Sequence, residues 1–262
     1  MSSIVRERFA RWVARDVSAR PLERFRIAFG LVWFAYDACD LAFSGTAWCA
    51  SWILTALDGA PLGLQLTQVA LLACQLLLIT GRRVPLAAFA CCGLRLFEYF
   101  VFFRVNDFLY YAVVAVWLGF AQPFGEASRR RVPAWVLHGL LIQTGWIYLA
   151  SAFLKLNPAF LSGEHFFVRY GYMTTALHWP YPAFVEPWLL SLPFDRALAL
   201  LTVSSEALLG TLLIMRRGRL LACVLAICIH TFAAVGMNVF FFGASLIAQV
   251  CLLFPARRSE PD

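Results

Sequence analysis

The sequence consists mainly of long apolar runs separated by short polar segments that are rich in arginine. Runs of this length are typical of helices that cross a bilayer, because about 20 apolar residues match the thickness of its hydrocarbon core. Eight segments fit this pattern, namely Leu22–Phe43, Gly63–Thr80, Val84–Phe103, Phe108–Pro123, Ala134–Leu156, Phe194–Met215, Leu220–Val235 and Val239–Phe254. The pattern predicts an all-α fold, a polytopic membrane bundle of about eight transmembrane helices.

The apolar segments divide the chain into three parts. A basic segment covers residues 1–21, a single transmembrane domain covers residues 22–254, and a short tail covers residues 255–262. Within the domain, the long loop 157–193 has room for a re-entrant or interfacial helix. Composition supports a membrane class: 61% of the residues are hydrophobic and 14% are charged, whereas a soluble domain is about half apolar and about a quarter charged.

Arginines gather in alternate loops. They occupy the N-terminal segment, the loops after the second, fourth and sixth predicted helices, and the tail, as Arg6, Arg8, Arg11, Arg15, Arg20, Arg82, Arg83, Arg129–Arg131, Arg216, Arg217, Arg219, Arg257 and Arg258. Because positive charge is retained on the cytoplasmic side, both termini are predicted to be cytoplasmic. The net charge of +7 then faces the anionic lipid of the bilayer, and no nucleic acid partner is predicted.

Lys155 is the single lysine among 22 basic residues, and the predicted topology places it at the extracytoplasmic end of the fifth helix. Unlike arginine, a lysine in a low-dielectric site can lose its proton and act as a base. The alternative is a lysine that extends to the membrane surface. Thr144, Tyr148, Ser151 and Lys155 recur at intervals of four, three and four, which places them on one helical face. This stripe predicts a polar pocket with an amine at its mouth.

Other polar residues lie within or at the ends of predicted helices, where charge is costly. They are Arg95, Glu98, Asp107, Glu206, His230 and Asn238. Such residues face the bundle interior, pair with each other or line a polar cavity. Arg95 and Glu98 are three residues apart and are predicted to pair on one helical face. Two interpretations remain open for Arg95 and Glu98: a functional pocket, or an ion pair that locks helices together.

The eight cysteines form no metal-binding or redox motif. Cys91, Cys92, Cys223 and Cys228 lie in predicted helices, where thiols usually pack as small apolar groups. Cys39 and Cys49 can both face the oxidising side, so a disulfide and two free thiols remain alternatives. No metal site is predicted.

The segment YLASAFLKLNPAFLSG, from Tyr148 to Gly163, resembles the lysine motif of the horizontally transferred transmembrane domain family. Its best-known members are the vitamin K-dependent gamma-carboxylases. In that motif, small residues lead to Lys-Leu-Asp or Lys-Leu-Asn, then to an aromatic residue and a glycine. The matching residues are Lys155, Leu156, Asn157, Phe160 and Gly163. The segments FRIAFG and VNDFLYYAVV, and the run from Glu206 through RRGR to His230, also resemble family segments in the same order.

The resemblance implies a chemistry. In the carboxylases, a lysine at the position of Lys155 is the proposed base that deprotonates a reduced naphthoquinone. With O2 this quinol becomes a stronger base, which removes a proton from a peptide glutamate, and the carbanion then captures CO2. The implied catalytic residues are Lys155 and His230. The candidate pocket residues are Arg95, Glu98, Asp107, Tyr148, Ser151, Asn157, Glu206 and Asn238.

Two features depart from the carboxylases. They carry two adjacent lysines, whereas Leu154 precedes Lys155 here. The chain ends at Asp262, soon after the last predicted helix, so we expect a membrane core that lacks the large extracytoplasmic domain of the carboxylases. A peptide substrate would then require a partner or a small docking surface.

Three functions remain open from the sequence. The first is a quinol-dependent, carboxylase-like carbon–carbon lyase that modifies peptide glutamate. The second is an accessory protein that helps a secreted peptide to mature or to be exported. The third is a quinone- or lipid-binding subunit of a membrane redox assembly. In each case the expected location is a prokaryotic plasma membrane, and the expected partners are the bilayer and a secreted peptide or an extracytoplasmic protein. The active side is expected to be extracytoplasmic.

Overall fold

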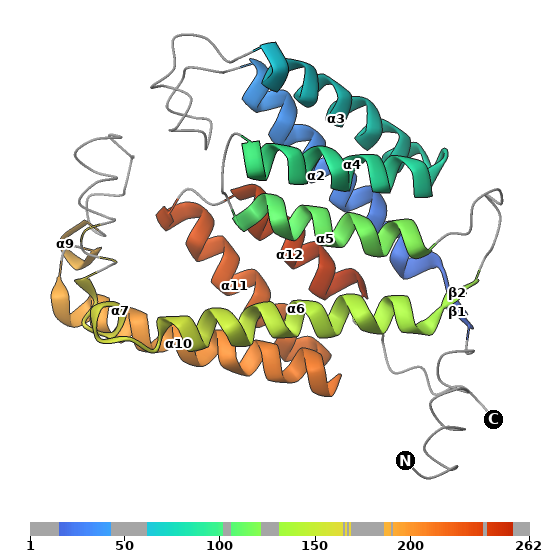
Figure 1. Ribbon diagram of the computed structural model, residues 1–262. Helices are drawn as coiled ribbons and strands as arrows, with labels where there is room; N and C mark the ends of the chain where they lie inside the picture. Colours follow the sequence, from blue (N-terminus) through green and yellow to red (C-terminus); the bar gives the residue numbers. More distant parts are fainter. Residues whose placement is uncertain are drawn as a thin grey trace, which may run out of the picture. The chain divides into compact units, whose positions relative to one another are not determined.

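The computed structural model describes residues 16–42, 62–101, 106–121, 131–164, 166, 168, 186–189, 191–237 and 240–253. These residues are mostly helical (Figure 1). Contacts divide the chain into two compact units, one of residues 1–141 with 257–262 and one of residues 142–256. Helix α6 belongs to both units, since the division falls within it.

Among the residues described, the first unit contains four helices, a small sheet and the start of a fifth helix. Its elements are β1 (Asp16–Ser18), α2 (Arg20–Ala42), α3 (Leu62–Thr80), α4 (Val84–Val101), α5 (Asn106–Ala121), β2 (Arg131–Pro133) and the first residues of α6 (Ala134–Lys155). Helices α2 to α5 each pack against the next in sequence. Strands β1 and β2 pair antiparallel, with Val17 opposite Val132.

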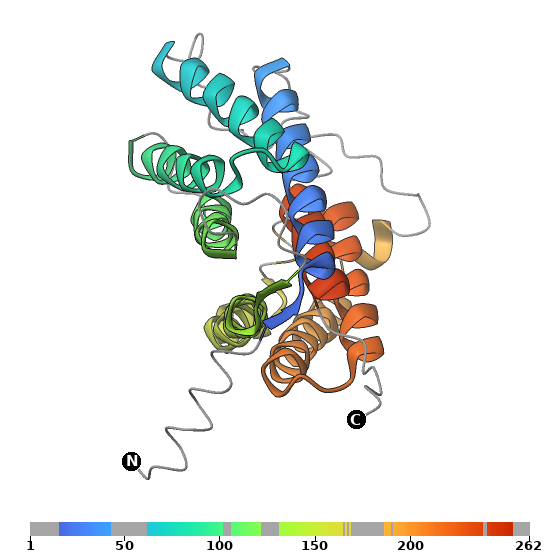
Figure 2. The ribbon, with the colours of Figure 1, turned by 90° about the vertical axis from the view of Figure 1, so that its right-hand side faces the viewer.

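The second unit contains the remainder of α6 and the C-terminal helices. Its other elements are α7 (Pro158–Leu161), α9 (Glu186–Leu189), α10 (Leu192–Met215), α11 (Arg219–Met237) and α12 (Phe240–Leu253). Helix α11 packs against both α10 and α12, and the short helix α7 packs against α10. Figures 1 and 2 both show α6 and α10 side by side.

The eight predicted segments correspond to α2–α6 and α10–α12, and their ends agree to within two residues. The predicted all-α membrane class is confirmed to this extent. Four helices, α3, α4, α6 and α10, are long and apolar enough to cross a membrane, judged by length and composition. Helix α2 has 23 residues but carries several ionisable side chains, and α5, α11 and α12 have shorter apolar stretches. The two-stranded sheet was not predicted from the hydrophobic pattern.

The core of the first unit surrounds Arg95, which is 1% exposed. Its Nη2 donates to both carboxylate oxygens of Asp37, and its Nη1 donates to Glu98 Oε2 over 2.5 Å. Gln75 Nε2 donates to Asp37 Oδ2, also over 2.5 Å. The Arg95–Glu98 pair predicted from their spacing is therefore present. Asp37, from α2, was not predicted to join it.

Aromatic rings surround the guanidinium of Arg95. Its central carbon lies between 4.7 and 5.8 Å from the ring centroids of Trp33, Tyr36, Phe108 and Tyr111. A cation is attracted to the face of an aromatic ring, and more strongly where water is excluded. Arg95 of α4 thus contacts groups from α2 and α5, and Gln75 of α3 binds the same carboxylate of Asp37.

The α6–α10 contact is a close approach of two backbones in the second unit. A Cβ built on Gly145 would lie 2.9 Å from the carbonyl oxygen of Gly210, and one on Gly210 would lie 2.7 Å from the carbonyl oxygen of Gly145. Real Cβ atoms do not approach backbone so closely without displacing it. Small residues allow such approaches between membrane helices. The pair therefore sets the spacing of α6 and α10.

We predict that Arg95→Met destabilises the protein strongly. The substitution leaves the carboxylates of Asp37 and Glu98 buried without their cation, a change that costs about 3–5 kcal/mol in comparable cases. Thermal unfolding of the detergent-purified protein, followed by tryptophan fluorescence, measures the effect. Arg24→Met is the matched control, because Arg24 lies exposed on α2. Equal melting temperatures for the two variants would contradict this account.

We also predict that Gly145→Ala and Gly210→Ala each lower the melting temperature, because the added methyl meets backbone of the facing helix. Overpacking of this kind costs about 1–3 kcal/mol. Gly93→Ala is the control, since a Cβ there meets nothing within 4 Å, and it should leave the melting temperature unchanged or slightly higher. Tolerance of alanine at both α6 and α10 positions would show that the backbones do not touch.

Candidate functional site

Lys155 is the last residue of α6, and three oxygen acceptors surround its amine. Nζ donates to Glu206 Oε1 over 2.5 Å, to Glu206 Oε2 over 2.6 Å and to Ser151 Oγ over 2.7 Å. Ser151 precedes Lys155 by one helical turn, and Glu206 comes from α10. The Lys155 side chain is 26% exposed and that of Glu206 is 9% exposed. The amine is therefore paired, on a side chain that is partly exposed.

Asn157 ends α6 and begins α7, which fixes where Lys155 stands. Its Oδ1 accepts from the backbone N–H of Phe160 over 2.9 Å, and its Nδ2 donates to the carbonyl of Leu154 over 2.8 Å. Asn is a favoured residue at helix starts because its side chain satisfies a free backbone donor. Pro158 follows as the first helical residue, a position that lacks an intrahelical partner for N–H in any case. Asn157 thus contacts backbone in this structure.

Gly163 closes the same segment against α10. Its φ is +84°, and a Cβ there would lie 2.6 Å from the backbone nitrogen of Arg196. Both the positive φ and the close approach require glycine. Arg196 Nε in turn donates to the carbonyl of Ser162 over 3.1 Å. The aromatic and glycine positions of the lysine motif therefore shape the turn that holds α7 on α10.

An apolar cluster lies beside the amine. It consists of Ala152, Phe160, Phe166, Ala199 and Val203, with Leu161, Leu198, Ala207 and Phe232 packed against it. Lys155 Nζ lies 5.8 Å from the centroid of the Phe160 ring. Apolar surroundings lower the local dielectric constant and strengthen charge interactions. The Lys155–Glu206 ion pair is thus stronger here than the same pair in water.

A second polar pair involves Tyr148, which lies about two turns before Lys155 on α6. Tyr148 Oη and His230 Nε2 are 2.5 Å apart, and both residues are buried. His230 comes from α11, and Gly243 of α12 leaves room for its ring: a Cβ on Gly243 would lie 3.0 Å from His230 Cβ. Lys155 and His230 are near enough to interact electrostatically. Helices α6, α10 and α11 therefore each supply a polar group to this region.

The structure brings together five of the ten candidate site residues, namely Tyr148, Ser151, Lys155, Glu206 and His230. Asn157 stands next to them as a helix cap. Arg95 and Glu98 lie in the buried network of the first unit. Asp107 lies half-buried in the first turn of α5. Asn238 lies outside the described residues, and so does Cys49, whereas Cys39 is a free thiol.

Sequence reasoning missed two pairings. Asp37 pairs with Arg95, which is 58 positions away. Lys155 and Glu206 were each singled out, but not as partners, and they are 51 positions apart. A charged residue within an apolar helix can be recognised from the sequence. Its partner cannot, because the pairing depends on how the helices pack.

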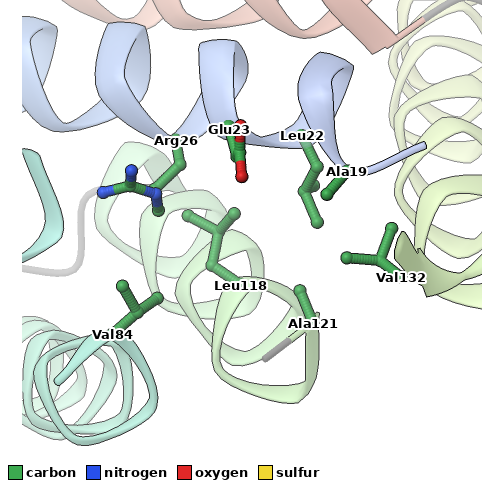
Figure 3. A pocket seen from close by; sticks show the side chains of 8 residues that line it. All are labelled: Ala19, Leu22, Glu23, Arg26, Val84, Leu118, Ala121 and Val132. Carbon is green, nitrogen blue, oxygen red and sulfur yellow. The ribbon is translucent and has the colours of Figure 1, made fainter. Parts of the chain in front are cut away.

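Arg26 lines a small cavity in the first unit (Figure 3). The other lining residues are Ala19, Leu22, Glu23, Val84, Leu118, Ala121 and Val132. The cavity volume is about 10 Å³, room for about one water molecule. Arg26 Nη1 donates to the carbonyl of Ile79 over 3.3 Å. This contact ties α2 to the end of α3.

Among the described residues, no three His, Cys, Asp or Glu side chains are grouped so that they could hold a metal ion. The Lys155 region contains an amine, a carboxylate, two hydroxyls and an imidazole. These groups can donate, accept and pass protons.

No family model matches the sequence, and neither does any curated protein or any solved structure. We therefore infer function from the side chains around Lys155 and from the motif resemblance.

Proposed function

We propose that this chain is a membrane protein of the horizontally transferred transmembrane domain type, in which α2–α6 and α10–α12 each cross the bilayer. Both termini then lie in the cytoplasm, and Lys155 lies at the extracytoplasmic end of α6, in a prokaryotic plasma membrane. Support comes from eight helices at the eight apolar segments and from arginines in alternate loops.

We propose further that Lys155 and Glu206 form the proton-accepting centre of a quinol-dependent modifier of peptide glutamate. The observation that carries this proposal is an amine paired with a carboxylate over 2.5–2.6 Å, on a lysine side chain that is 26% exposed. Transfer of one proton from Lys155 to Glu206 turns two opposite charges into a neutral amine and a neutral acid. The amine is then free to accept a proton from a substrate.

The side chains present suit a reduced naphthoquinone. Glu206 and Lys155 offer an acceptor and a donor to a ring hydroxyl, and the flat ring of Phe160 lies beside them. Such a quinol supplies, together with O2 and CO2, the strong base and the carboxyl group that glutamate carboxylation needs. The chain itself accepts the hydroxyl proton at Lys155 Nζ, once the lysine's own proton has passed to Glu206. The Tyr148–His230 pair positions the inner end of the site.

The same ion pair favours a second candidate, an accessory protein that assists maturation or export of a secreted peptide. A Lys155–Glu206 contact joins α6 to α10 and is sufficient to lock the two helices together. In that case the charge of Lys155 is needed, but its ability to release a proton is not.

Lys155→Arg separates the two candidates. Arginine keeps the positive charge and the ion pair with Glu206 but does not release a proton in proteins. We expect membranes carrying this variant to lose quinol-dependent incorporation of labelled bicarbonate into a co-expressed secreted peptide, by about 10²–10⁴-fold, the range for a removed general base. Lys155→Met, which removes charge and base together, should lose at least as much.

The control is delivery of the same peptide to the outside of the cell. Unchanged delivery with Lys155→Arg, together with lost incorporation, supports the enzyme. Unchanged incorporation with Lys155→Arg excludes Lys155 as the base. Defective delivery with Lys155→Met alone, without any incorporation in the wild type, supports the accessory protein.

The single lysine also reports topology. In intact cells, a membrane-impermeant amine reagent should label Lys155 and leave the N-terminal amine unlabelled until the membrane is opened. Glu206→Gln should increase the rate of Lys155 labelling, because it removes the ion pair that holds the amine. Peptide mass spectrometry distinguishes the two amines.

Ser162→Ala is a suitable control for the labelling rate, because Ser162 lies close by without contacting the amine. Labelling of the N-terminus but not of Lys155 in intact cells would reverse the proposed orientation. An unchanged Lys155 rate in Glu206→Gln would mean that the ion pair does not govern the amine.

A further inference from the structure

Asp195 is a buried acid in the first turn of α10 that lies outside the contacts of Lys155. It is 0% exposed, and neither of its carboxyl oxygens has a hydrogen-bond partner among the described residues. Glu206 lies on the same buried face of α10, about three turns further along. Both oxygens of Glu206 accept from the Lys155 amine. Of the two acids on this face, Glu206 is therefore paired with a cation, whereas Asp195 pairs with none that the structure describes.

Residues 158–164, which we call the α7 turn, pack against Asp195. Figure 1 shows α7 beside the start of α10, and the two helices are in contact. A Cβ on Gly163 would lie 2.9 Å from Asp195 Cβ and 2.7 Å from its backbone carbonyl carbon. Ala199, one turn after Asp195, belongs to the apolar cluster beside Lys155. The Asp195 side chain therefore lies against the backbone of the α7 turn, next to the apolar cluster.

The charged groups around this end of α10 have other contacts or lie exposed. On the elements packed against α10 and on α10 itself, the described titratable groups nearest to it are Glu164 after α7, Glu186 of α9, His230 of α11 and Arg196. Arg196 Nε donates to the carbonyl of Ser162, and Lys155 is held by Glu206. The described residues also include no group of three His, Cys, Asp or Glu side chains that could bring a metal ion to Asp195.

A proton is the ligand that suits this carboxyl group. An ionised carboxylate that loses its water without gaining a cation or hydrogen bonds is costly, and such groups become neutral instead. Protonation removes the charge and requires no further coordinating atoms. The absence of donors around both oxygens, in the part of the chain that the structure describes, matches a neutral acid better than a carboxylate.

We propose that Asp195 is a proton-binding site that controls whether the α7 turn rests on α10. With the proton bound, the carboxyl group is neutral and the turn covers it. When the proton passes to water, the carboxylate favours an open arrangement in which the turn lifts and water reaches the charge. Opening uncovers the apolar cluster beside Lys155. The proposal does not depend on the reaction proposed for Lys155.

The direction of the pH effect follows from the two arrangements. In the open arrangement the carboxyl group is in water, where an aspartic acid ionises with a pKa of about 3.9. The covered arrangement binds the proton. Raising the pH therefore favours the open arrangement, by up to about tenfold per pH unit while the covered group stays protonated. Acid pH stabilises the closed turn.

Hydrogen exchange of the α7 turn measures its opening. The backbone N–H groups of Leu161, Ser162 and Gly163 donate to carbonyls within the same segment. A four-residue helix is not stable alone, so these groups exchange once the turn leaves α10. For the full-length protein in detergent, we expect their protection factors, which correct for the intrinsic effect of pH, to fall about tenfold or more between about pH 5 and about pH 8. Residues 202–210 of α10 serve as the internal reference.

Two neutral variants and one control identify the group. Asp195→Asn and Asp195→Leu should each keep the α7 turn protected across the pH range, and their melting temperatures relative to the wild type should rise with pH. Glu164→Gln is the matched control, because it removes an exposed acid next to Gly163; it should retain the wild-type pH dependence. Protection that does not vary with pH in the wild type would overturn the proposal. So would a wild-type pH dependence in either Asp195 variant, or relative melting temperatures that do not change with pH.

Discussion

Charge in an apolar helical interior must be compensated, and this constraint organises both units. Moving an ion out of water costs several kcal/mol even after relaxation, as an order of magnitude, unless an opposite charge and hydrogen bonds replace the lost solvent. In the first unit, Arg95 is compensated by Asp37, Glu98 and four aromatic rings. In the second, Lys155 is compensated by Glu206 and Ser151. Each network draws its partners from different helices. Separating the helices would therefore leave buried charges without their partners.

Short-range signals in the sequence were sufficient to place the helices. Apolar runs bounded by arginines gave the extent of α6 as Ala134–Leu156, and the helix ends one residue earlier, at Lys155. The same logic predicted the pairing of Arg95 with Glu98, since residues three apart share a helical face. These features depend only on neighbours along the chain, and for that reason they are readable from it.

Pairings between distant helices were not readable. Asp37 pairs with Arg95, 58 positions away, and nothing near Asp37 in the sequence pointed to α4. The contacts of Lys155 with Glu206 require α6 and α10 to approach until Gly145 and Gly210 touch. How closely α6 and α10 approach depends on how their two surfaces fit together, so neither segment alone predicts it. The strands β1 and β2 were missed for a similar reason, because three residues of extended chain carry too little pattern to predict a partner more than 100 positions away.

The two ionic networks differ in what they can do, although they are built by the same rule. Arg95 is 1% exposed and carries a guanidinium, which stays protonated in proteins. It can hold helices together but cannot exchange a proton with a substrate. Lys155 is 26% exposed, and its proton can pass to Glu206 without leaving net charge in an apolar setting. Accessibility and a removable proton therefore make Lys155, rather than the more extensively bonded Arg95, the position at which this fold can support chemistry.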